Sequence, residues 1–151
     1  FTVIGLIVLT ACASATPTPS PTATPQPTAA PSSNQPLVST VKAGNWSGGG
    51  ENNFTISFTV GDGGNAIANG VQVTFKATCG SNASNITETL AGKTNLAFKS
   101  GEVNYADANF KVTGRALAAD RIEGTFKADG ISLGKLGQCS TSIIAWSASP
   151  K

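Results

Sequence analysis

The stretch Phe54-Thr55-Ile56-Ser57-Phe58-Thr59-Val60 alternates apolar and polar residues without a break. This period of two is typical of a β-strand with one face in a core and the other in water. Gly61-Asp62-Gly63-Gly64-Asn65 follows directly, and these residue types favour a turn. A second alternating run comes next, in which one face is formed by Val71, Val73, Phe75, Ala77 and Cys79. The sequence therefore predicts two strands joined by a turn.

Shorter segments on either side repeat the pattern, with Gly, Asn and Asp between them. No stretch shows a convincing helical period, and Arg115 to Arg121 is expected to join two strands. Short strands at such spacing predict an all-β fold: a small antiparallel β-sandwich, or a partly closed barrel, of about 7–9 strands. The further strands are predicted over residues 86–90, 96–99, 108–112, 122–127 and 140–148.

The N-terminal residues have a different character. Phe1 to Leu9 form an apolar run that is too short to span a bilayer but fits the hydrophobic region of a secretory signal. No positively charged residue precedes it, so we expect the sequence to be truncated at its N-terminus. Leu9-Thr10-Ala11-Cys12 resembles the bacterial lipobox, in which small residues precede a cysteine that receives a lipid. The prediction is a signal peptide over 1–11 and lipidation of Cys12, the alternative being a short buried helix with an incidental cysteine.

Residues 12–43 are predicted to form a lipid-anchored linker. Seven of the eight prolines lie between Pro17 and Pro36, and no charged residue precedes Lys42. Such a segment has few apolar side chains to bury, and its prolines favour an extended, disordered spacer. The β-domain is then expected over residues 44–149.

The three cysteines divide into one lipidated residue and two that remain, Cys79 and Cys139. Outside the cytoplasm, two such thiols in a small β-domain are expected to form a disulfide. A redox or metal-binding pair is the alternative, but the sequence has no Cys-x-x-Cys spacing and no histidine.

Two tryptophans stand near the ends of the predicted domain, and each leaves two interpretations open. Trp46 is a candidate ligand platform, since a flat ring can stack on the apolar face of a sugar. Alternatively, Trp46 and Trp146 both lie in the core, where the first and last strands commonly pair and bury large rings. Trp146 shares its parity with Ile144 and Ala148, which favours burial.

Several short motifs together resemble a group of small secreted bacterial β-sandwich domains. Members of that group are exported, often behind a lipobox and a low-complexity linker, and have no assigned activity. The resemblance implies the sandwich fold and the disulfide, and it supplies no catalytic residue. It rests on Gly44-Asn45-Trp46-Ser47-Gly48, Ile56 to Val60, Cys79-Gly80, Phe110 to Gly114, Ile122 to Phe126, and Cys139 with Trp146-Ser147-Ala148.

The composition argues against several functions. The net charge of +2 is small and scattered, so a nucleic-acid partner is not expected. Without histidine the chain lacks the commonest general base and metal ligand, so we expect no enzyme activity, no cofactor and no metal site. The predicted function is a non-enzymatic binding or envelope-interaction module. It would be extracytoplasmic, anchored to the bacterial membrane by its N-terminal lipid, with a glycan or a cell-envelope protein as partner. The alternatives are a purely structural spacer and a carboxylate-based glycoside hydrolase.

Overall fold

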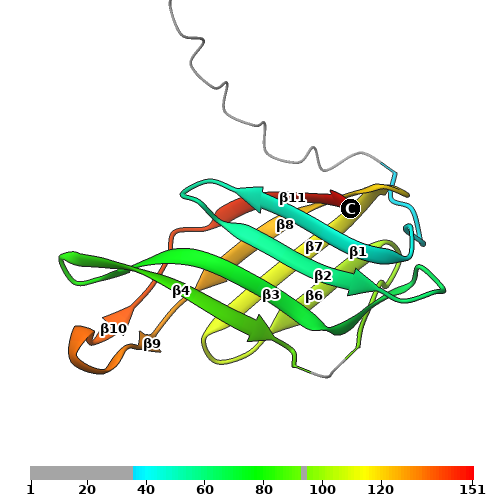
Figure 1. Ribbon diagram of the computed structural model, residues 1–151. Helices are drawn as coiled ribbons and strands as arrows, with labels where there is room; N and C mark the ends of the chain where they lie inside the picture. The colour runs from blue at the N-terminus through cyan, green and yellow to red at the C-terminus, as the bar shows by residue number, and fades with distance from the viewer. Residues whose placement is uncertain (1–35, 93–94) are drawn as a thin grey trace, which may run out of the picture.

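The computed structural model describes residues 36–92 and 95–151. Cys12, the signal peptide predicted over 1–11 and most of the linker therefore lie outside the described residues. Within them the regular structure is almost entirely β-strand, with one short 3-10 turn (Figure 1). No helix in this part of the chain is long and apolar enough to cross a membrane.

One antiparallel sheet dominates the fold, with the order β4-β3-β2-β1-β11-β8-β7-β6 and with β5 paired to β3. A separate ribbon consists of β9 and β10. The first and last strands, β1 and β11, pair at the centre of the sheet, as the core interpretation of the two tryptophans predicted. The elements are β1 (Gly44–Gly50), β2 (Thr55–Val60), β3 (Ala66–Cys79), β4 (Asn82–Leu90), β5 (Leu96–Ala97), β6 (Glu102–Ala106), β7 (Phe110–Ala118), β8 (Arg121–Ala128), β9 (Ile131–Ser132), the 3-10 turn η1 (Gly134–Leu136), β10 (Gln138–Cys139) and β11 (Ile144–Pro150).

The sheet curls until its two halves face each other. Phe75 on β3 and Phe126 on β8 are four strand spacings apart along the sheet, which in a flat sheet would be roughly 19 Å. Their ring centroids are only 4.8 Å apart, so they meet across the interior. The all-β prediction is confirmed. The connectivity is that of the partly closed barrel, while the halves pack face to face as the layers of a sandwich do.

The core follows the alternation that the sequence predicted. All five residues of the face from Val71 to Cys79 are buried. Phe126 also packs against Phe54, with ring centroids 5.0 Å apart. Gly124, on the same strand, lets β7 and the indole of Trp146 approach closely, since an added Cβ would lie 1.8 Å from the carbonyl oxygen of Thr113. The interior is thus filled by aromatic and branched side chains, as in other small barrels.

The prediction of one strand over residues 140–148 is wrong for its first four residues. Cys139 belongs to β10, residues 140–143 do not continue it as a strand, and β11 begins at Ile144. This break resolves the opposite parity of Cys139 and Trp146, because the two residues lie on different strands. Both are buried.

The segment before β1 belongs to the folded domain, so the boundary predicted at residue 44 is too late. The backbone N–H groups of Val38, Val41 and Lys42 donate to the carbonyl oxygens of Ala116, Gly64 and Ala119, respectively. The Val41 side chain is buried in the common core. Residues 38–42, which we call the N-terminal strap, are therefore hydrogen-bonded to two loops and to β7 near its end.

Candidate functional site

Trp46 does not form the exposed platform that one interpretation predicted. Its side chain is 1% exposed, and its ring stacks on Phe58 with centroids 5.9 Å apart. The indole Nε1 donates to the carbonyl oxygen of Lys42 in the N-terminal strap, at 2.8 Å. Because Trp46 points inward from β1, no ring face is available to a sugar, and the core interpretation is the one that holds.

Trp146 is also buried, as its parity predicted. It borders a small cavity of about 10 Å³ whose other walls include Ile56, Val71, Val103 and Tyr105. Such a volume holds one water molecule at most. The interior of the curled sheet therefore has no room for a sizeable ligand there.

A larger hollow lies on the outer face, over β1, β2 and β3 and next to Thr89 of β4. It is a groove of about 400 Å³, and we call it the outer groove. Its exposed or half-exposed side chains come from four strands, and the charged residue in its lining is Lys151. The polar side chains are Asn45, Ser57, Thr59, Asn69, Gln72 and Thr89.

Strand alternation explains why these side chains gather on the outer face. Asn45 and Thr59 are register partners on β1 and β2, and each neighbours a core aromatic, Trp46 or Phe58, that points inward. Ser57, Gln72 and Thr89 form a further row across β2, β3 and β4. One buried face and one polar face on the same strands produce both the core and the groove.

A two-residue bulge forms part of the groove lining. Phe58 pairs with Val71 and Thr59 pairs with Ala68, so Asn69 and Gly70 are extra residues on β3. Both have positive φ, 59° and 78°. A Cβ on Gly70 would lie 2.4 Å from the carbonyl oxygen of Leu90, so only glycine fits there. Because two residues are inserted, Ile67 and Val71 still face the core.

Hydrogen bonds between side chains order the groove. The Thr59 hydroxyl donates to Asn45 Oδ1 at 2.9 Å, and the Ser57 hydroxyl donates to Gln72 Oε1 at 3.5 Å. With their oxygens engaged, the two amides retain NH₂ donors for other partners. The groove thus offers amide donors from two strands, beside hydroxyls that can both donate and accept.

The outer groove was not among the sites predicted from the sequence. The available signal was Asn69-Gly70, a dipeptide typical of turns, inside the otherwise strand-like run from Ile67 to Cys79. The rest of the site depends on the register between strands, which the spacing along the chain does not reveal.

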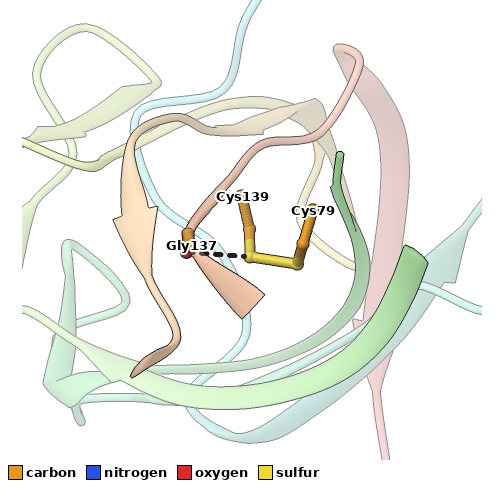
Figure 2. The surroundings of a disulfide bond; sticks show 3 residues. All are labelled: Cys79, Gly137 and Cys139. Atoms are coloured by element: carbon orange, nitrogen blue, oxygen red, sulfur yellow. Dashed lines mark hydrogen bonds between the residues drawn. A yellow bond between two sulfur atoms is a disulfide. The ribbon is translucent and has the colours of Figure 1, made fainter. Parts of the chain in front are cut away.

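The predicted disulfide is present between Cys79 and Cys139, with the Cα atoms 4.2 Å apart (Figure 2). Next to it, Thr78 and Ser140 exchange two backbone hydrogen bonds of 2.8 and 2.9 Å. The Cys139 sulfur also lies 3.6 Å from the carbonyl oxygen of Gly137, a packing contact because a disulfide sulfur carries no proton. The disulfide therefore fixes the β9–β10 ribbon to the end of β3, away from the residues that line the outer groove.

The acidic side chains do not gather in the outer groove, whose lining contains no Asp or Glu. Glu123, the most buried acid, is paired with Arg121, while Asp129 is paired with Lys127 at 2.9 Å. The Lys127 ammonium lowers the pKa of Asp129, mainly through its hydrogen bond and in addition through its positive charge. No observation here favours the hydrolase alternative.

Asp107 is held in a turn by protein donors. Its oxygens accept hydrogen bonds from the Tyr105 hydroxyl at 2.5 Å and from the backbone N–H groups of Asn109 and Phe110. Partial burial acts to raise the pKa of Asp107, but these three hydrogen bonds together outweigh it and lower the pKa. The same bond to Asp107 is the main reason that the pKa of Tyr105 is raised. In the part of the chain that the structure describes, no three acidic, cysteine or histidine side chains form a group able to hold a metal.

Comparisons of the chain with protein-family models, with curated protein sequences and with solved structures each found no match.

Proposed function

We propose that this chain is an extracytoplasmic lipoprotein whose β-domain is a non-enzymatic binding module. Lipidation at Cys12 would hold it at the membrane, and the proline-rich linker would carry the domain away from the surface. The disulfide in the β-domain supports this location, because structural disulfides persist mainly in oxidising compartments.

The observation that carries the binding proposal is the outer groove. It is a hollow of about 400 Å³ with ordered polar side chains and a bulge of positive-φ residues in its lining. Bulges commonly occur where a strand must redirect side chains near a functional site. A purely structural spacer would not require such a groove.

Binding is tested with the full chain carrying Cys12→Ser, so that the protein stays in solution. Isolated cell envelopes of the producing bacterium are titrated with the labelled protein and with two variants. Gln72→Ala removes a groove amide, whereas Asn104→Ala removes an exposed amide from β6, outside the groove lining. We expect saturable binding that Gln72→Ala weakens and Asn104→Ala leaves unchanged. Absence of saturable binding, or equal binding by all three proteins, would contradict the proposal and leave the spacer alternative.

The location is tested separately. The native chain should label with a fatty-acid analogue and fractionate with membranes, and Cys12→Ala should abolish both. Unchanged labelling in Cys12→Ala would overturn the lipid anchor without affecting the groove.

A further inference from the structure

We infer that the outer groove binds a neutral, hydroxyl-rich glycan chain; this deepens the proposed function and rests on it. The lining of the groove carries little charge. None of the lining residues is acidic, and Lys151 is the single basic one. The remaining polar groups are hydroxyls and carboxamides, which are uncharged at every physiological pH.

The neutral character extends beyond the groove itself. The outward positions of β2 are Thr55, Ser57 and Thr59, and those of β3 beside them are Gln72 and Thr74. Thr74 exchanges a hydrogen bond of 2.9 Å with Thr87 on β4. A chain longer than the groove would therefore continue to meet hydroxyls as it crosses β3 towards β4.

Charged and apolar ligands fit this surface poorly. A polycation would lose hydration without finding an Asp or Glu side chain in the groove lining, and a polyanion would find one basic side chain, that of Lys151. An apolar ligand would cover the hydroxyls and amides and leave them without hydrogen-bond partners, which is costly. A polyol replaces water at each of these groups with an equivalent donor or acceptor.

A peptide strand also fits the face poorly. Peptides that add to β-sheets do so at an edge, where backbone N–H and C=O groups are unpaired. The groove lies mainly over β1, β2 and β3, which all have strand neighbours on both sides, and it reaches the edge strand β4 only at Thr89. Recognition therefore uses side chains, and the amides of Asn45 and Gln72, whose oxygens accept hydrogen bonds from Thr59 and Ser57, supply NH₂ donors.

The predicted affinity is modest, because the two aromatic residues under the groove, Trp46 and Phe58, are buried and cannot stack on a sugar. Loss of one neutral hydrogen bond weakens binding about 2- to 12-fold. A neutral ligand should also bind equally well at low and high salt, since screening acts only on charges.

The test is isothermal titration of the full Cys12→Ser chain with three oligosaccharides of equal length: a neutral cello-oligosaccharide, an anionic oligogalacturonate and a cationic chitosan oligomer. We expect binding of the neutral oligomer alone, unaffected by salt, weakened about 2- to 12-fold by Gln72→Ala and unchanged by Asn104→Ala. Circular dichroism and urea unfolding of each variant confirm that it is folded.

The possible results distinguish the glycan inference from the binding function on which it rests. Tighter binding of a charged oligomer, or neutral binding that Gln72→Ala does not change, would overturn the glycan inference. No oligosaccharide binding, together with envelope binding that depends on Gln72, would overturn the glycan inference and leave the binding function intact. Failure in both assays would overturn both.

Discussion

Trp46 and Phe58 are register partners on β1 and β2, and their rings stack inside the core with planes 13° apart. Their neighbours Asn45 and Thr59 are also register partners, but these point outward and share a hydrogen bond. The outer groove therefore rests on backbone that is held in place by a buried aromatic pair. Its polar side chains are positioned by the same strands that build the core.

Trp46→Phe should lower the stability of the domain without removing a ligand contact. The change leaves the carbonyl oxygen of Lys42 without its indole donor and alters the stacking on Phe58. We expect a loss of about 1–3 kcal/mol in the free energy of unfolding, measured by urea denaturation. Envelope binding at temperatures where the variant is folded should persist. An unchanged stability combined with abolished binding would instead support the platform interpretation.

The disulfide should account for a large part of the stability. Replacing both cysteines, Cys79→Ser with Cys139→Ser, opens a loop with a sequence separation of 60 residues. In the chain-entropy model this costs on the order of 4 kcal/mol. Urea unfolding of the double variant, beside the wild-type protein with its disulfide intact, measures the difference. Equal stability of the two proteins would show that the bridge does not constrain the fold.

The N-terminal strap should be required for full stability, although the sequence placed it in the linker. Val41→Ala removes buried apolar surface, and we expect a loss of about 1–2 kcal/mol. Lys42→Ala is the matched control, since this neighbouring side chain is exposed, with an ion pair to Asp120 of 3.8 Å. Its effect should stay within about 0.5 kcal/mol. Equal effects of the two substitutions in thermal denaturation would contradict the packing of the strap.

Gly124→Ala should destabilise the sheet where β7, β8 and β11 meet. The added methyl group would lie 1.8 Å from the Thr113 carbonyl oxygen and 2.7 Å from Cζ2 of Trp146, so backbone and indole must both shift. Overpacking of this kind typically costs 1–3 kcal/mol. Lys127→Ala on the same strand serves as control and should be nearly neutral. Both are compared by urea unfolding, and a neutral Gly124→Ala would show that β7 and β8 are spaced more widely.

Acidic pH should weaken the turn around Asp107. The pKa of Asp107 is lower in the folded protein than in the unfolded chain, so its stabilising effect is fully present above the unfolded value of about 3.9. The effect is lost as the pH falls through the folded value. The gap in unfolding free energy between wild type and Asp107→Asn should therefore be larger at pH 7 than at pH 3. A gap that does not change with pH would contradict this assignment.

Alternation predicted the strands in which apolar side chains face the core and polar side chains face the solvent. The runs 54–60 and 71–79 became β2 and the second half of β3 because each apolar side chain marks the core face. β1 shows no such alternation, because its last three residues are glycines and have no side chains. The N-terminal strap was not predicted because Val41 is its one buried residue, and Val38 and Lys42 are held by backbone hydrogen bonds that the side-chain pattern does not reveal.

The outer groove was harder to predict, because it depends on pairing between residues far apart in the chain. Asn45, Thr59 and Gln72 are brought together by the order β1-β2-β3, and the bulge at Asn69 and Gly70 shifts the register between two of these strands. Polar residues along one face of a strand normally indicate only that this face of the sheet is exposed to solvent. Only their arrangement around a hollow distinguishes this group.

The central claim, that the outer groove is the ligand site, is tested most directly by nuclear magnetic resonance. Backbone amide shifts of the full isotope-labelled Cys12→Ser chain are followed during titration with the neutral oligosaccharide. We predict that the largest shifts fall at Asn45, Thr59, Asn69 and Gln72, with little change on β6 and β7. Shifts concentrated on β6 and β7, or no shifts at saturating ligand, would contradict the claim.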